Sequence, residues 1–478
     1  MTKPISEKFS QELEKLVGKT NMLINSSDLS GYLQEERGLL ESFCTLVVRP
    51  SNTAQLSKIV ILCNDFGISM VPLGGNTGLV GGGIADGGII ISLEKLNVIE
   101  KVDPVNHTMI VGAGCILANI QEAAREADCL FPLSLGAEGS CQIGGNLSTN
   151  AGGVNVLQYG NARDLVLGLE AVLPDGRIFE DLNQLRKNNT GYDLKQLFIG
   201  SEGTLGIITK AVLKLSPLPI NYATTIVGLS SLDKVLPLFE MTRENNSSNL
   251  SAFELIPRIA LDLGIKHIPG MVDPFGSHHP HYVLIELSSS NPKDNSREAI
   301  EETLETALSK EIITDAVIAD NDSQMKQLWR IREEIPAAQS KEGGSIKHDI
   351  SVPISETVKF IKTATKMVEN LIPGSRICAF GHIGDGNIHF NITQPVGYDK
   401  QAFLDSWTEV NRVVHDLVTD MGGSISAEHG IGILKRDELK LYLPEIHIDL
   451  MRQIKTSFDP KNLMNPDKIF VLDKEKVG

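Results

Sequence analysis

The chain has 478 residues, which at about 150 residues a domain predicts two or three domains with sizeable cores and excludes a small disulfide-stabilised scaffold. Its 44 basic and 60 acidic residues leave a net charge of −16, so nucleic acid and anionic membrane surfaces are not expected as main partners. The 43 glycines, against 5% aromatic residues, indicate many positions where the backbone turns tightly or approaches a ligand closely.

The cysteines and the first residues bear on the compartment. The six cysteines show no C-x-x-C spacing, as expected of reduced core thiols in a cytosolic or matrix-like compartment. Residues 1–23 contain no arginine and no apolar stretch of the kind found in signal or transit peptides, and no apolar run is long enough to span a bilayer. We therefore expect a cytoplasmic, bacterial-like protein without a transmembrane segment.

The first predicted domain, residues 1–218, mixes helices and strands. Helices are expected at three places: 7–23, 53–64 and 117–126. Strands are predicted by short apolar runs punctuated by glycine: 45–48, 69–72, 88–93, 108–112 and 165–173. This mixture favours an α/β or α+β domain, and the domain ends near residue 216 because Pro217 and Pro219 follow.

The second predicted domain, residues 219–425, contains strands and longer helices. The helices are expected at 296–311, 321–334 and 358–371. Residues 270–281 form a loop rich in proline and glycine, whose histidines we expect to be solvated: His278, His279 and His281. A third, mostly helical segment, residues 426–478, completes the chain.

Three glycine-rich elements lie in the first domain. Residues 72–83 follow a predicted strand, and their glycine density lets successive backbone N–H groups converge on one phosphate. Residues 136–153 add small hydroxyl and amide side chains suited to lining a flat polar ring system, and residues 189–194 with 200–208 form the third element. Any one element could be a flexible or structural loop, but three in one domain favour a large phosphorylated cofactor. Neither the G-x-G-x-x-G nor the P-loop spacing is present.

In this order the elements resemble the vanillyl-alcohol-oxidase-type FAD domain, and in particular the FAD-linked D-lactate and D-2-hydroxyglutarate dehydrogenases, from about residue 47 to the C-terminus. The resemblance implies an α+β fold: a two-part FAD-binding domain, an α/β substrate (cap) domain and a helical C-terminal segment. It implies non-covalent FAD, because no histidine lies between Val71 and Gly88. The implied FAD-binding residues are Pro72, Gly74, Gly75, Asn76, Thr77, Gly78, Leu79, Gly81, Gly82, Gly139, Ser140, Gly144, Gly145, Ser148, Thr149, Asn150, Gly152, Gly153, Gly203, Ile207, Ile208 and Asn465.

Two histidines flank a predicted β-hairpin that turns on residues 384–387. A turn on Asp385 and Gly386 would pair His382 with His389 on one face, close enough for both imidazoles to bind one divalent ion. Asn391, two residues further along the strand, would point the same way.

A third metal ligand is needed, and residues 426–430 supply Glu428 as the candidate, with His429 beside it as a candidate base. The alternative is that His382 and His389 are hydrogen-bonded strand histidines and that Glu428 begins a helix. The resemblance implies the first interpretation, with zinc or another divalent metal on His382, His389 and Glu428 and with His429 as catalytic base.

Substrate anchoring is predicted for Arg332 and Lys347, because a carboxylate substrate requires a guanidinium fork and a point charge. The resemblance implies that these two residues, with Asn391 and His429, bind the substrate. The alternative for both residues is a salt-bridged helix face with Glu333 and Glu334. Related hydroxyglutarate enzymes carry a threonine where Pro336 stands, which affects the contacts to a distal carboxylate.

The resemblance implies an FAD-dependent dehydrogenase that oxidises a D-2-hydroxy acid, D-2-hydroxyglutarate or D-lactate, to the 2-oxo acid by hydride transfer to the flavin. An electron-transferring flavoprotein, a quinone or a cytochrome would reoxidise the flavin, and a homodimer is a compatible assembly. Two other hypotheses stand beside it: a metal-dependent hydrolase whose glycine loops bind a nucleotide, and a flavin-binding sensor without turnover.

Overall fold

The computed structural model describes residues 5–472, which divide into two compact units. Unit 1 draws on three segments of the chain: the segment up to Gly153, Gly160–Leu218, and the residues from Glu428 onward. Unit 2 contains Pro219–Ala427 together with a short excursion of the earlier chain, Val154–Tyr159. The fold of each unit mixes helices with sheets, as the sequence predicts.

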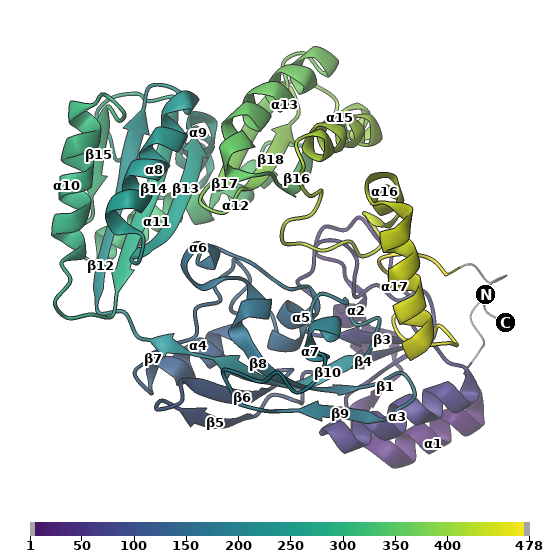
Figure 1. Ribbon diagram of the computed structural model, residues 1–478. Helices are drawn as coiled ribbons and strands as arrows, with labels where there is room; N and C mark the ends of the chain where they lie inside the picture. The colour runs from purple at the N-terminus through teal and green to yellow at the C-terminus, as the bar shows by residue number, and fades with distance from the viewer. Residues whose placement is uncertain (1–4, 473–478) are drawn as a thin grey trace. The chain divides into compact units, whose positions relative to one another are not determined.

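Unit 1 contains two larger sheets (Figure 1). The four-stranded sheet has the order β1-β2-β4-β3, and its members are β1 (Met22–Leu23), β2 (Leu46–Val48), β4 (Ile89–Ser92) and β3 (Met70–Leu73). The five-stranded antiparallel sheet has the order β5-β6-β10-β8-β9, and its members are β5 (Ile99–Asp103), β6 (Thr108–Gly112), β10 (Ile207–Lys214), β8 (Val166–Val172) and β9 (Ile178–Asp181). A small ladder joins β7 (Cys129–Leu130) to β11 (Ser216–Pro217).

The helices of unit 1 are short or moderate in length. They are α1 (Glu7–Val17), α2 (Ser26–Leu33), α3 (Thr53–Phe66), α4 (Leu117–Arg125), α5 (Ile143–Ser148), α7 (Lys195–Phe198), α16 (Arg436–Tyr442) and α17 (Glu445–Phe458), with the 3-10 turns η1 (Lys19–Asn21) and η2 (Ala162–Leu165). Helix α3 shows why such a segment forms: the Asn52 side chain accepts the Gln55 N–H at its start, and Gly67 ends it in the left-handed conformation. Helices α1 and α3 lie side by side, with the Phe9 and Phe66 rings 5.5 Å apart (Figure 1).

The C-terminal segment is built into unit 1. The Met70 N–H donates to the Leu463 carbonyl and the Asn465 N–H donates to the Met70 carbonyl, so this segment adds to the edge of β3. The buried Lys455 ammonium of α17 donates to Asp459 and to the carbonyls of Thr204 and Met464. Residues far apart in the sequence therefore share one core.

Unit 2 is built on a seven-stranded sheet of order β15-β12-β14-β13-β17-β18-β16. The strands are β12 (Asn221–Leu229), β13 (Leu250–Pro257), β14 (His281–Ser289), β15 (Asp315–Ile318), β16 (Ser345–Ser351), β17 (Arg376–His382) and β18 (Asn387–Thr393). The helices are α6 (Val156–Tyr159), α8 (Val235–Asn246), α9 (Arg258–His267), α10 (Ser296–Ser309), α11 (Asp322–Glu333), α12 (Ile335–Ser340), α13 (Thr357–Leu371), α14 (Lys400–Asp405) and α15 (Trp407–Asp420), with the 3-10 turns η3 (Leu232–Lys234) and η4 (Ile354–Glu356).

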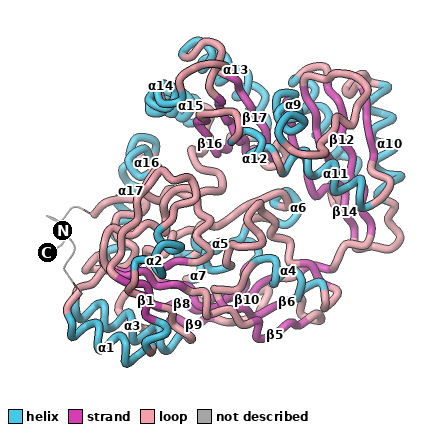
Figure 2. Tube along the Cα trace, turned by 180° about the vertical axis from the view of Figure 1, so that it is seen from behind, coloured by secondary structure: helices cyan, strands magenta, loops and turns pink. Residues whose placement is uncertain are grey.

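Helices cover both faces of this sheet. Val283 and Ile285 of β14 face a core shared with α8, α10, α13 and α15, whereas Tyr282 and Leu284 face a core shared with α9, α11 and α12. Figure 2 shows α10 and α11 beside β12 and β14. Because both faces are covered, the central strands carry apolar residues on both sides, with a few buried polar residues such as Glu254 among them.

Three sequence-based predictions need correction. The first helix ends at Val17 rather than residue 23, because Gly18 has a φ of 78° and the chain then enters η1 and β1. His279 is buried rather than solvated: its ring packs on Phe275 and Tyr282. The segment 154–159 belongs to unit 2 although it lies within the first predicted domain.

Candidate functional site

The glycine-rich segments of unit 1 lie against one another. A Cβ atom on Gly75 would lie 2.1 Å from the Ser140 carbonyl oxygen, and a Cβ on Gly203 would lie 2.6 Å from Cγ of Pro72. The Glu202 N–H donates to the Ser148 carbonyl, with a nitrogen-to-oxygen distance of 2.8 Å. Contacts this close exclude a side chain, so these glycines allow the three segments to form one continuous backbone surface.

Other glycines of the same segments face open space. Gly78, Gly139 and Gly145 have no atom within 4 Å of the position that a Cβ would occupy. Beside them lie three buried amide oxygens without a hydrogen-bond partner: Gln142 Oε1, Asn146 Oδ1 and Asn465 Oδ1. A buried acceptor without a donor is unfavourable unless a bound group supplies one. A polar cofactor with N–H and O–H donors, such as FAD, fits both the open glycine positions and these oxygens.

Some of the predicted FAD-binding residues have internal partners. The Ser148 hydroxyl donates to the Gly144 carbonyl and the Thr149 hydroxyl to the Gly145 carbonyl, both within the turns of α5. Ile207 and Ile208 are buried in β10. The Asn465 amide donates to the Gly82 and Glu202 carbonyls, and this ties the C-terminal segment to two glycine segments.

Glu428 and Glu202 connect the segment 428–432 to this surface. The Glu428 carboxylate lies against Gly152, 2.9 Å from the position of a Cβ there. The Glu202 carboxylate accepts the N–H groups of Ile431 and Gly432 at 2.7 and 2.8 Å. Burial raises the pKa of Glu202, and these N–H donors counter that effect in part. The predicted metal ligand Glu428 is therefore a neighbour of a predicted FAD-binding glycine.

In unit 2 the polar residues predicted from the sequence share one face of the sheet. The register pairs Lys347 of β16 with Asn391 of β18, and His389 of β18 with Phe380 of β17. Phe380 belongs to the core under α11 and α12, so these residues face that side of the sheet. His382 follows two residues after Phe380 and points the same way. The face thus brings together both histidines, Lys347 and Asn391.

The predicted register of the hairpin is wrong. The pairs Cys378–Asn391 and Phe380–His389 show that β17 is shifted by two residues from the predicted pairing of His382 with His389. The turn spans the four residues 383–386, since β17 ends at His382 and β18 begins at Asn387. A shift by two residues keeps side chains on the same face. The two imidazole rings are therefore diagonal neighbours, with centroids 5.6 Å apart.

Arg332 reaches the same face from α11. It is 7% exposed, and its Nε donates to Glu254 Oε2 at 2.7 Å, while its guanidinium lies 4.8 Å from the centre of the Phe380 ring. For Arg332, the alternative of a helix face salt-bridged to the adjacent glutamates is therefore wrong, because its salt-bridge partner is Glu254 of β13. Glu254 was not predicted as a site residue. A lone glutamate in the apolar run 250–257 was the available signal.

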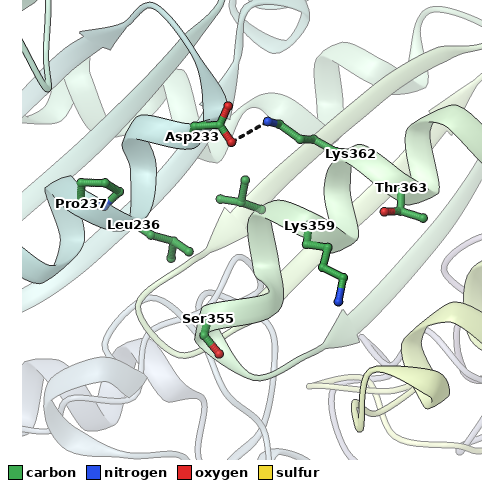
Figure 3. Close-up of a pocket in the computed structure, with 8 residues that line it drawn as sticks. Asp233, Leu236, Pro237, Ser355, Lys359, Lys362 and Thr363 are labelled. Atoms are coloured by element: carbon green, nitrogen blue, oxygen red, sulfur yellow. Dashed lines mark hydrogen bonds and ion pairs between the residues drawn. The ribbon is translucent and has the colours of Figure 1, made fainter.

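A separate pocket lies elsewhere in unit 2. It has a volume of about 490 Å³ and lies between the start of α8 and the start of α13 (Figure 3). Its two lysines are paired, Lys362 with Asp233 and Lys359 with Glu356. With these charges already neutralised, the pocket offers no evident anion site and is distinct from the histidine face.

Comparison with known proteins agrees with this arrangement. A family model described as the FAD binding domain matches residues 44–181, and one described as FAD linked oxidases, C-terminal domain, matches residues 218–469. The structure of p-cresol methylhydroxylase with substrate bound has a TM-score of 0.76 at 16% identity, over 98% of each chain. The fold class is confirmed: this is an FAD-linked oxidoreductase with the vanillyl-alcohol-oxidase type of fold.

The sequence relatives are closer. A Danio rerio protein named D-2-hydroxyglutarate dehydrogenase, mitochondrial, is 38% identical over 88% of this chain and 78% of its own. An Arabidopsis thaliana protein of the same name is 36% identical over 95% of this chain and 80% of its own. The chain belongs to the FAD-linked oxidase family, among its D-2-hydroxy acid dehydrogenases. These findings support the dehydrogenase hypothesis and not the metal-dependent hydrolase.

The expectation of a cytoplasmic location is wrong by the same comparison. The Danio rerio and Arabidopsis thaliana relatives both carry the word mitochondrial in their names. The residue pattern of positions 1–23 was therefore not sufficient to predict the compartment. No helix among residues 5–472 combines the length and the hydropathy of a membrane span.

Proposed function

We propose that this enzyme oxidises a D-2-hydroxy acid, with D-2-hydroxyglutarate as the preferred substrate, to the corresponding 2-oxo acid. The observation that carries the proposal is the shared face of unit 2, where two neighbouring imidazoles lie beside Arg332, Lys347 and Asn391. Two cationic side chains suit a substrate with two carboxylates better than one with a single carboxylate. The names of the Danio rerio and Arabidopsis thaliana relatives support the same substrate.

The substrate-binding roles follow from the chemistry of the side chains. Arg332 and Lys347 bind the carboxylates, and Asn391, whose amide donates to Gln339 Oε1 at 2.8 Å, orients the substrate from β18. Pro336 lies in the first turn of α12 and has no hydroxyl to offer a distal carboxylate. Recognition of that group then rests on the two cations.

The donor set fits a divalent metal, with zinc as the first candidate. His382 and His389 supply two imidazole nitrogens, and Glu428 would supply a carboxylate to complete a His₂Glu set with an open position. Glu428 directly follows Ala427, whose N–H donates to the Asp349 carbonyl, and Asp349 is the β16 partner of His389. When bound, the metal supplies a Lewis acid that lowers the pKa of the substrate hydroxyl.

Proton transfer is assigned to His429. Oxidation removes the hydroxyl proton and a hydride from C2, and a C=O double bond forms. His429 takes the hydroxyl proton, while the carboxylate-binding residues hold C2 in a fixed orientation. FAD, when bound, supplies the two-electron acceptor.

FAD is proposed to bind without a covalent link, since no histidine lies between Val71 and Gly88. Release of intact flavin on denaturation is the expected result. An electron-transferring flavoprotein, a quinone or a cytochrome would reoxidise it in a second half-reaction.

An anaerobic titration tests the proposed function. Purified enzyme is mixed without oxygen with the D- and L-forms of 2-hydroxyglutarate and lactate, and the visible flavin band is followed. We expect D-2-hydroxyglutarate to bleach the band at lower concentration than D-lactate, because Lys347 and Arg332 together accommodate a second carboxylate. The L-forms are the matched controls. A flavin that no D-2-hydroxy acid reduces would reject the function.

A further inference from the structure

Glu254 is a buried carboxylate with two engaged oxygens. It lies on β13, is 1% exposed, and its strand neighbours are apolar. Its Oε1 lies 2.7 Å from Nδ1 of His382, and its Oε2 lies 2.7 Å from Nε of Arg332. One buried carboxylate thus contacts two residues of the proposed site.

The contact with His382 selects one form of that imidazole. A carboxylate only accepts, so the proton lies on Nδ1 and the lone pair lies on Nε2. A histidine that binds a metal through one nitrogen commonly donates its other N–H to a carboxylate, which fixes the tautomer and the ring orientation. Glu254 is placed to do this for His382.

The contact with Arg332 fixes the direction of the guanidinium. Glu254 accepts from Nε, and the guanidinium lies over the Phe380 ring, so the bond to Glu254 leaves the two terminal nitrogens for other acceptors. Nη2 lies 3.5 Å from Nε2 of His382, the nitrogen that would bind the metal. The carboxylate-binding end of Arg332 is therefore held beside the proposed metal ligand.

We propose that Glu254 is a positioning residue that sets His382 for metal binding and Arg332 for carboxylate binding. The proposal rests on the proposed function. One carboxylate would then set the position of the proposed metal ligand relative to the proposed carboxylate-binding group, because His382 and Arg332 are each hydrogen-bonded to one of its two oxygens.

Glu286 provides a matched control. It lies on the neighbouring strand β14 and is also a buried carboxylate that accepts from α11, in this case from Trp329 Nε1 at 2.7 Å, and from the Thr224 hydroxyl at 2.8 Å. Its third hydrogen-bond donor is the Ser251 hydroxyl of β13, at 3.4 Å. A role confined to holding α11 on the sheet would give Glu254 and Glu286 variants the same properties.

The experiment compares Glu254→Gln, Glu254→Asp and Glu286→Gln with the wild-type holoenzyme. FAD content and the thermal midpoint report folding. Zinc affinity is measured on chelator-treated protein by competition with a coloured zinc indicator. The KM and kcat for D-2-hydroxyglutarate are measured at saturating zinc, which separates the effect on Arg332 from loss of metal.

We expect the zinc dissociation constant of Glu254→Gln to rise about 10- to 100-fold and its KM at saturating zinc to rise about tenfold or more, the loss expected for a misdirected charged hydrogen bond. Glu254→Asp keeps the carboxylate on a shorter side chain, so its zinc dissociation constant and its KM should lie between those of the wild type and Glu254→Gln. If Glu254→Gln does not fold, the test rests on Glu254→Asp. Glu286→Gln should stay within about twofold in both quantities.

Two results would contradict the proposals, and each contradicts a different part of them. If the wild type binds zinc and Glu254→Gln keeps both the zinc affinity and the KM of the wild type, Glu254 has no positioning role. If the wild type binds no zinc, the metal part of the proposed function and the role of Glu254 in orienting His382 are both wrong. If the KM of Glu254→Gln also equals that of the wild type, the role of Glu254 in orienting Arg332 is wrong as well.

Discussion

Buried carboxylates are the residues that organise each unit, and they do so with different partners. Glu202 in unit 1 accepts backbone N–H groups, and burial leaves its pKa raised. Glu254 in unit 2 accepts hydrogen bonds from His382 and Arg332, and these partners outweigh burial and hold its pKa below its usual value. Each carboxylate therefore fixes a segment that carries a proposed catalytic or ligand residue, Glu202 by holding the backbone after His429 and Glu254 by holding His382.

Replacement of the proposed base is the first prediction at this scale. His429→Ala should lower kcat by about 10²- to 10⁴-fold, because a positioned general base contributes that much. FAD content should not change, because the glycine surface does not depend on the imidazole. Stopped-flow measurement of flavin reduction checks the rate. His447→Ala, an exposed histidine of α17, is the control and should behave as wild type. Wild-type reduction by His429→Ala would remove this residue from the mechanism.

At the scale of elements, glycines of one loop have two distinct tasks. Gly75 lets the loop 72–83 touch the Ser140 carbonyl, whereas Gly78 of the same loop borders open space. The close contact at Gly75 is a packing requirement of the protein itself. The open space beside Gly78 is not required by protein packing, and a cofactor-binding surface needs such space.

Alanine at these glycines should separate the two tasks. Gly75→Ala should lower the free energy of unfolding of the apoprotein by about 1–3 kcal/mol, since backbone must move to admit the methyl group. Gly78→Ala should leave that free energy within about 0.5 kcal/mol and weaken FAD binding by about tenfold, or about 1.4 kcal/mol. Denaturant unfolding and flavin fluorescence titration measure the two quantities.

Gly31→Ala in α2 is the control, because a Cβ there also meets open space. It should change neither quantity appreciably. Equal FAD affinity in Gly78→Ala and wild type would show that this part of the loop does not contact the cofactor.

At the scale of the whole molecule, the residues proposed to bind the two cofactors come mostly from different units, with Glu428 of unit 1 as the exception. The glycine surface belongs to unit 1, and the paired imidazoles with Arg332 and Lys347 belong to unit 2. Loss of one cofactor should therefore leave binding of the other largely intact. Turnover should require both.

Metal removal tests this separation. Dialysis against a strong chelator should abolish most D-2-hydroxy acid oxidation while the flavin absorbance remains, and added zinc should restore the rate. Mg²⁺, which prefers oxygen ligands, is the control addition and should not restore it. Activity that survives complete removal of metal, verified by elemental analysis, would contradict a role for the metal.

Much of the local structure was predictable from the sequence. The observed helices α3, α10 and α13 agree with the predicted ranges to within two residues at each end, because periodicity and capping residues are local signals. The glycine segments and the pair His382 and His389 were also visible, since their meaning depends on residue types at short spacing.

Tertiary structure determined the features that these local sequence signals do not specify. The hairpin register depends on how β13, β16 and β18 pair around β17, and the predicted register was therefore two residues off. Glu254 reaches His382 only because β13 and β17 are adjacent, 128 residues apart in the sequence. Local patterns specify which atoms could do chemistry. Which of them meet depends on long-range packing free energy, and no short stretch of sequence contains that information.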